Sequence, residues 1–408
     1  MISGFQRFGS IETADGLANA MVCMDADRPT EMMLHFYSDK IKPGAVLADC
    51  TREENRIQLI PRLLFRPGEN GGLNLPNLTD QEVRAMMNTR AVIEEKDGAW
   101  EGVWSNAEGQ TSRMHFPELR AATSVHPTIC NTWPEFKDWA SSVREKHDAL
   151  TFRGHGSSQF RLATTFHRAG RSRLERYCSE ELVTFKNHAE AVLGARFNLG
   201  DGEDYSTILG LAQHHGLPTP LLDWTASPYI AAFFAFSDAL EAARGNEHTH
   251  VRIYGLTREF VNQTSPAVVT LPTTQPYVAS LAISARQNAR LYAQQGRFLV
   301  TNVSTVEDYI LFLETKAQKK FLFAAELPVQ LASAALEDLA YMGLTAATLF
   351  PGLDGVCRMM RHAMSFAPRS IKAPGHPIGA LDAPVAVSNT DADHCVEKVD
   401  ANPPQRSD

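Results

Sequence analysis

The stretch QHHGLPTPLLDWTASP, residues 213–228, places two histidines and an aspartate on either side of a turn that contains two prolines. Because proline fixes its own φ, this turn is stiff and holds the polar side chains around it in place. A rigid polar edge ahead of a helix is where a small anionic ligand can meet backbone N–H groups. We therefore predict that His214, Asp223 and Trp224 bind a ligand at one wall of a cleft.

A metal-dependent hydrolase that uses His214, His215 and Asp223 is a weaker alternative. The side chains of two adjacent residues usually point apart, and the sequence has no HExxH or similar spacing of metal ligands. We therefore expect no metal ion at this site.

The same stretch continues into a helix whose start is well marked. Either Thr225 or Ser227 can cap the helix, and Pro228 has the φ that the first helical turn requires. The residues from Pro228 to Phe236 are apolar on all sides of this helix. A helix that is apolar all round is buried, so capping alone explains part of the stretch.

A second segment with possible chemistry is TFRGHGSSQFRLATTFHRAGRSRLER, residues 151–176. Arg153 can make a bidentate contact with a phosphate, and Gly154 lets the backbone approach a ligand closely. A buried salt bridge explains Arg153 equally well. We interpret the arginines from Arg171 to Arg176 as a solvated charged surface.

Two further segments carry polar residues of interest. Asp354, in TLFPGLDG, is a candidate catalytic carboxylate, although an aspartate before glycine is chiefly a turn former. In ARQNARLYAQQGRF, four polar residues could line a polar cleft, namely Asn288, Arg290, Gln294 and Gln295. For these residues we favour the surface of a helix.

The helices and strands predicted around these residues indicate an α+β fold, in which helices pack on a mixed sheet. Residues 1–120 are predicted to form a separate, small β-rich domain. In this domain a turn at Asn106–Gly109 joins two strands, and Trp100 and Trp104 pack the sheet rather than bind a ligand. Residues 121–131 are predicted to be a linker.

The main domain is predicted at residues 132–365. It contains a long amphipathic helix over 172–197 and a second β-containing region over 249–325. The apolar TAATLF, residues 345–350, is predicted as a strand. Residues 366–408 are rich in Pro, Ala and Asp with little periodicity, so we predict a disordered tail.

Bulk composition limits the classes of function. The formal net charge of -8 argues against a protein that coats nucleic acid by bulk electrostatics. The six cysteines are scattered, without a CxxC pair, which is typical of reduced thiols in a cytoplasmic protein. Without a signal peptide or a sufficiently long apolar run, we expect no membrane association. The oligomeric state stays open.

Four of these segments, in this order, resemble the FRG domain, a bacterial family named for its (F/Y)RG motif. The motif is Phe152-Arg153-Gly154, and the resemblance continues through QHHGLPTPLLDWTASP, QQGRF and TLFPGLDG. It covers residues 130–360, and the length of the QHHGLPTPLLDWT match makes it specific. The family implies no particular reaction.

The layout is also similar to that of arginine-serine-glutamate ADP-ribosyltransferases, in which an aromatic-Arg-Gly strand precedes a Ser-Thr-Ser element and an Ala/Phe-rich helix. This resemblance implies that Arg153 holds the phosphates of NAD and that Thr225 and Ser227 organise the nicotinamide-ribose pocket. An acidic residue would stabilise the oxocarbenium-like transition state. The sequence has no Gln/Glu-x-Glu element. The candidates for this acidic residue are therefore Asp354, Glu314 and Glu326.

The expected function is therefore an NAD-dependent transferase that modifies a protein or nucleic acid, compatible with a toxin or phage-defence role. NAD would be its substrate, with Arg153, Gly154, His214, Asp223 and Trp224 as binding residues. The alternative is a non-catalytic module that binds a nucleotide or nucleic acid.

Overall fold

The computed structural model describes residues 5–13, 16–69, 71–106, 108–118, 123–242, 249–263, 271–283 and 289–365. The predicted disordered tail over 366–408 lies outside these residues. Within them, no helix has the length and apolar character that crossing a bilayer requires.

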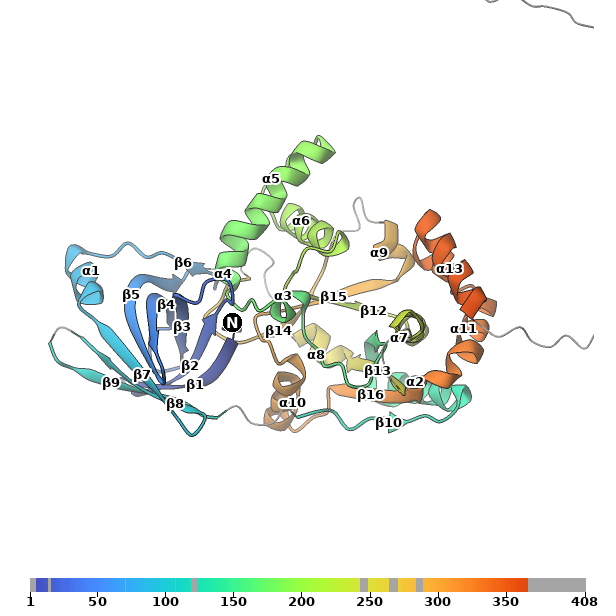
Figure 1. Cartoon of the computed structure of the whole chain (residues 1–408), viewed down its shortest axis with the longest axis horizontal. Helices are drawn as coiled ribbons and strands as arrows, with labels where there is room; N and C mark the ends of the chain where they lie inside the picture. Colours follow the sequence, from blue (N-terminus) through green and yellow to red (C-terminus); the bar gives the residue numbers. More distant parts are fainter. Residues whose placement is uncertain are drawn as a thin grey trace, which may run out of the picture. The chain divides into compact units, whose positions relative to one another are not determined.

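The first part of the chain is a closed antiparallel barrel with a short helix, α1 (Asp80–Met87). Each barrel strand pairs with its neighbours along the chain, and the pairings β4–β5 and β1–β9 close the ring (Figure 1). The strands are β1 (Phe5–Thr13), β2 (Gly16–Met24), β3 (Glu31–Tyr37), β4 (Gly44–Glu53), β5 (Arg56–Pro67), β7 (Arg90–Lys96), β8 (Ala99–Ser105) and β9 (Thr111–Phe116), with β6 (Leu73–Asn74) paired at the edge of β5.

The barrel confirms the prediction that the N-terminal part of the chain is rich in β-structure. The predicted hairpin around Asn106–Gly109 joins β8 to β9. Trp100 is 2% exposed inside the barrel and Trp104 packs against the same apolar cluster, so both tryptophans serve the sheet as predicted.

The second part is a seven-stranded mixed sheet in the order β10-β16-β13-β11-β12-β15-β14. Only β10 and β16 pair in parallel within this sheet. Its strands are β10 (Thr128–Ile129), β11 (Ala149–His155), β12 (Leu221–Thr225), β13 (His250–Thr257), β14 (Val278–Leu281), β15 (Gly296–Thr301) and β16 (Leu322–Pro328). An α+β fold with a mixed sheet was expected, and β10 lies in the segment that we predicted as a linker.

Helices cover both faces of this sheet. They are α2 (Trp133–His147), α3 (Thr165–Arg168), α4 (Leu174–Arg176), a π-helical turn (Tyr177–Glu181), α5 (Leu182–Leu193), α6 (Gly202–His214), α7 (Pro228–Ala242), α8 (Arg258–Gln263), α9 (Ala289–Ala293), α10 (Val306–Ala317), a 3-10 turn (Val329–Leu331), α11 (Ala332–Tyr341), α12 (Ala346–Leu349) and α13 (Leu353–Ser365). Side chains of α2, α7 and α11 share one apolar cluster with β11, β13 and β16, whereas α8 and α10 pack on the other face. The central α7 is buried, as its all-apolar sequence predicts.

One predicted strand is wrong. The segment TAATLF contains the helix α12, which begins after Thr345. The Thr345 hydroxyl accepts a hydrogen bond from the Thr348 N–H, and the Thr348 hydroxyl accepts one from the Thr345 backbone N–H. Such reciprocal capping starts a helix, and a short apolar run cannot by itself distinguish a helix from a strand.

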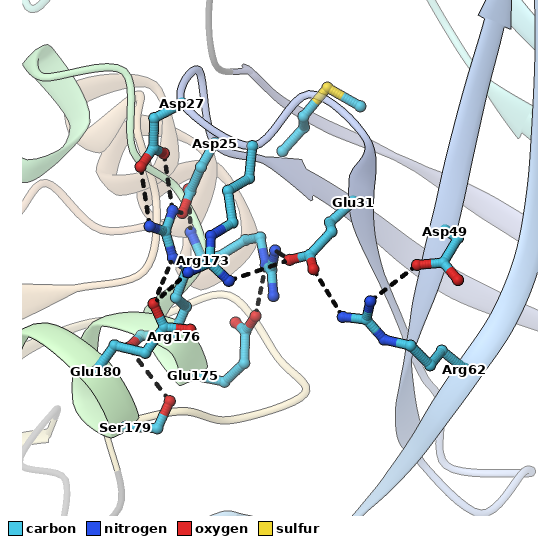
Figure 2. Close-up of polar contacts among 12 residues, drawn as sticks. Asp25, Asp27, Glu31, Asp49, Arg62, Arg173, Glu175, Arg176, Ser179 and Glu180 are labelled. Atoms are coloured by element: carbon cyan, nitrogen blue, oxygen red, sulfur yellow. Dashed lines mark hydrogen bonds and ion pairs between the residues drawn. The ribbon is translucent and has the colours of Figure 1, made fainter.

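The arginines after Arg171 also differ from the prediction. The side chains of Arg173 and Arg176 are 3% and 7% exposed, so they do not form a solvated surface. Figure 2 shows them facing Asp25, Asp27 and Glu31 of the barrel. Asp25 lies at the centre, where its carboxylate accepts hydrogen bonds from the backbone N–H groups of Ser172 and Arg173 at 2.7 and 3.1 Å and from Arg176 Nη1 at 2.9 Å. The basic segment thus joins the barrel to the sheet domain.

This ion-pair cluster is expected to stabilise the chain mainly through Asp25. In Asp25→Ala, three buried donors lose their acceptor, and we expect a loss of about 2–3 kcal/mol in the free energy of unfolding. Urea denaturation measures the change. Asp49→Ala is the control, because that carboxylate is 54% exposed and pairs with Arg62 at the surface. Equal losses in both variants would contradict this role of Asp25.

Acid is expected to loosen the same cluster. The hydrogen bond from Arg176 lowers the pKa of Asp27 to about 2. Burial opposes the shift at Glu31, but hydrogen bonds from Arg173 and Arg62 lower the pKa of that carboxyl to about 2 as well. Both values lie below the ordinary values of about 4 for unfolded carboxyls. The stabilisation is therefore present above about pH 4 and is lost as the pH falls toward 2.

Candidate functional site

A cavity of about 320 Å³ opens beside Arg153. Its walls come from β11, β12, β15, α6, α7 and α9, and from Phe350 after α12. The polar side chains that line it are Arg153, Gln213, His214, Asp223, Thr225, Asp238, Arg290 and Gln294. Residues of four separate sequence segments therefore meet at one site. The volume lies at the low end of the range of small-molecule pockets.

Arg153 is fixed on β11, the central strand of the sheet. Alternation along β11 buries Phe152 in the core and sends Arg153 and His155 to the opposite face. The guanidinium Nη1 donates to the carbonyl oxygen of Asp223, and Nε donates to His155 Nε2 at 3.0 Å. Desolvation by the surrounding protein lowers the pKa of Arg153 from its ordinary value, and the nearby Asp223 carboxylate opposes this shift. A guanidinium stays protonated under these conditions, so Arg153 presents a fixed positive charge to the cavity.

His155 holds Arg153 as a neutral imidazole. Its burial, followed by the positive charge of Arg153, lowers the pKa of His155 to about 3. Nε2 accepts the bond from Arg153, which leaves the proton on Nδ1 to donate to the carbonyl oxygen of Phe160 at 3.2 Å. This tautomer satisfies both ring nitrogens and restrains the guanidinium.

Gly154 lines the cavity and also allows close packing of α7. A Cβ at this position would lie 1.9 Å from the carbonyl oxygen of Ala231, in α7. A Cβ on Gly156 would lie 2.8 Å from the Cβ of Asp238 in the same helix. Although Gly154 lines the cavity, its lack of a side chain chiefly allows α7 to pack against β11.

Two carboxylates line the cavity. Gln213 donates to Asp223 Oδ2 at 2.6 Å, so the Asp223 side chain is oriented by α6. Asp238 lies on α7, close enough to Arg153 for their charges to interact. Desolvation raises the pKa of Asp238 to about 6, while Arg358 and Arg153 lower it and Glu241 adds to the rise. A carboxyl with such a pKa is ionised at neutral pH and can still accept a proton.

Thr225 and Ser227 have internal partners. The Thr225 hydroxyl donates to the carbonyl oxygen of Gln294 at 2.8 Å and accepts from the Ser227 N–H at 3.2 Å. Ser227 Oγ accepts from the Ile230 N–H at 3.3 Å and so caps α7, as one of the two predicted capping residues. Thr225 lines the cavity, whereas Ser227 lies outside its lining.

Of the other predicted binding residues, His214 and Trp224 line the cavity. His214 lines the cavity, and desolvation lowers its pKa. His215 is exposed and lies outside the lining, with its ring perpendicular to that of His214. Trp224 is 3% exposed and contributes an apolar wall. Among the residues that the structure describes, no group of three His, Cys, Asp or Glu side chains is placed to hold a metal ion.

The three acids considered from the sequence lie away from the cavity lining. Asp354 is 93% exposed in the first turn of α13, 3.8 Å from Arg290. Glu314 accepts from the backbone N–H groups of Phe321 and Leu322, and Glu326 pairs with Arg252. The two glutamates therefore have structural partners.

The sequence did not predict Asp238 as a site residue. It predicted Arg290 and Gln294 on a helix surface, whereas both line the cavity. The available signal for Asp238 was the Ser237-Asp238 pair that interrupts an apolar helix. Arg290 and Gln294 were assigned to a helix surface because α9 is only a short turn and its neighbour in space cannot be read from its sequence. Gln294 Nε2 donates to the carbonyl oxygen of Leu349 at 3.0 Å, which ties α9 to α12 at the mouth of the cavity.

One known family matches the part of the chain that contains β11 and α7. The FRG domain family model matches residues 148–244, which begin directly before β11 and extend past α7. The matched span contains Arg153, Asp223 and Asp238, whereas Arg290 and Gln294 lie beyond it. Neither the curated proteins nor the solved structures include a match to this chain. Residues 148–244 of the chain therefore match the FRG domain family.

Proposed function

We propose that the cavity binds NAD and that the protein is an ADP-ribosyltransferase that modifies a protein or nucleic-acid target. The observation that carries the proposal is the meeting of Arg153 and Asp238 in one cavity. A fixed guanidinium suits a phosphate, and a carboxylate nearby suits a positive charge that develops during the reaction. Phe234, Phe298 and Phe350 supply aromatic surface for a ring.

In the proposed reaction, the bond between the nicotinamide nitrogen and ribose C1′ breaks and nicotinamide leaves with the bonding electrons. The ribose ring then carries an oxocarbenium-like charge, which the Asp238 carboxylate stabilises. A nucleophilic oxygen or nitrogen of the target forms the new bond to C1′, and its proton passes to Asp238. Arg153, and Arg290 across the cavity, hold the phosphates during this step.

The alternative function is a nucleotide-binding module without catalysis. The internal hydrogen bonds of Thr225 and Ser227 favour it, because these hydroxyls already serve the loop and helix around them. The two functions differ in one respect. A binding module needs Arg153 for affinity but has no step that depends on an ionised Asp238.

The test is incubation of the purified protein with labelled NAD and a cell lysate. We expect Arg153→Ala to lower transfer of label and release of nicotinamide by about 10²-fold, since it removes the charged phosphate contact. Arg144→Ala is the matched control, because Arg144 is 67% exposed on α2. Intact NAD in every sample, combined with measurable nucleotide binding that requires Arg153, would replace the transferase with the binding module.

A further inference from the structure

The outer face of α13 is apolar. Leu353, Met360 and Met364 are 81%, 57% and 82% exposed, and Cys357 between them is exposed as well. These four positions follow one another at intervals of 4, 3 and 4 residues, which places them in a single stripe along the helix. A soluble surface rarely carries such a continuous apolar stripe without a partner.

Contacts made by the opposite face of α13 keep the apolar stripe exposed. His362 Nε2 lies 3.0 Å from the hydroxyl oxygen of Ser237 in α7, and Arg358 pairs with Glu241 of α7 at 2.9 Å. A Cβ on Gly355 would lie 2.0 Å from the carbonyl oxygen of Phe350, so this face is closely packed. These contacts place α13 against α7. The stripe therefore cannot turn inward without breaking these contacts.

We propose that the stripe is the interface of a homodimer, in which α13 of two copies pack antiparallel about a two-fold axis. In antiparallel helix pairs, residues at the central positions interdigitate. The spacing of the stripe brings Leu353 against the partner's Met364, and Cys357 against the partner's Met360. Symmetry repeats both contacts.

Charge complementarity selects a second copy over another partner. Asp354 and Arg361 lie on the same flank of the stripe, seven residues apart, and both are exposed, with Asp354 also 3.8 Å from Arg290 of its own chain. In the register given by the apolar contacts, Asp354 lies beside the partner's Arg361, and symmetry makes the pair twice. The stripe is thus complementary to itself in charge as well as in apolar contact.

Sedimentation velocity over a range of protein concentrations tests the dimer. We expect a concentration-dependent dimer for the natural chain and a monomer for Met360→Glu, because the glutamate puts two like charges into the apolar seam. The matched control is Val192→Glu, which adds the same charge at an apolar residue of α5 that is 84% exposed. The proposal is overturned if the natural chain stays monomeric, or if Met360→Glu dimerises like the control.

A charge exchange tests the antiparallel register. Asp354→Arg and Arg361→Asp should each weaken the dimer by roughly 10-fold, and the double variant should recover most of the affinity. Failure of the double variant to recover, with both single variants folded by circular dichroism, would exclude this register.

Cross-linking places the helix at the interface. In a Cys395→Ser background, a bismaleimide should join two copies through Cys357, and Cys357→Ser should remove the product. A cross-linked product that survives Cys357→Ser would put the contact elsewhere. These measurements require no NAD, so their outcome is independent of the proposed transferase activity.

Discussion

Asp238→Asn is expected to lower turnover of NAD by about 10²–10³-fold while it leaves NAD affinity nearly unchanged. The amide has the shape of the carboxylate but no negative charge, so it cannot stabilise the oxocarbenium-like charge or accept the proton of the target. The phosphate contact of Arg153 is retained in this variant. Single-turnover kinetics and equilibrium binding measure the two effects separately.

The dependence of turnover on pH provides a sharper test of Asp238. Its pKa is raised to about 6, so the ionised form predominates above pH 6. Turnover should be constant above that value and fall about tenfold per pH unit below it, since only the carboxylate is active. His214 lines the same cavity and has a lowered pKa, so the profile should be repeated in His214→Gln. An inflection that disappears only in His214→Gln would assign it to the imidazole.

Two controls define the role of the acid. Glu145→Gln removes a carboxylate that is 69% exposed on α2, and it should turn over NAD like the natural chain. Asp223→Asn alters the second carboxylate of the cavity. A loss of turnover in Asp223→Asn with full activity in Asp238→Asn would move the catalytic role to Asp223.

Gly154→Ala is expected to destabilise the sheet domain by about 3 kcal/mol or more. The new methyl group would lie 1.9 Å from the carbonyl oxygen of Ala231, which is helix backbone and cannot rotate away. Either α7 moves off the sheet or β11 distorts, and both changes disrupt the buried cluster between them. Thermal denaturation followed by circular dichroism measures the loss.

Gly202→Ala is the matched control for Gly154→Ala. A Cβ at Gly202 would meet no atom within 4 Å, and the residue begins α6. We expect its stability to change by no more than about 0.5 kcal/mol, because the helix accepts alanine readily. Similar melting temperatures for both variants would show that the close approach of α7 to β11 does not limit stability.

Several features could be predicted from the sequence because each depends on neighbouring residues. Apolar residues all round α7 predicted its burial, and the Ser227-Pro228 pair predicted its start. The alternation and turn residues near Asn106–Gly109 predicted the β8–β9 hairpin. The Phe152-Arg153-Gly154 motif and the stretch from Gln213 predicted the FRG domain, which is a property of sequence alone.

Which polar residues share a site became clear only from the folded chain, because these residues are far apart in the sequence. Asp238 is separated from Arg153 by strand, loops and several helices, and it reaches the cavity because Gly154 and Gly156 let α7 pack closely on β11. The candidate acid at Asp354 lies on an exposed turn instead. Likewise, the sequence around Arg173 and Arg176 is typical of a solvated surface. Only the burial of these two side chains against acidic residues such as Asp25 shows that they join the barrel to the sheet domain. Packing between segments that are distant in the sequence brings charged side chains to such partners. The local periodicity of the sequence does not predict this packing.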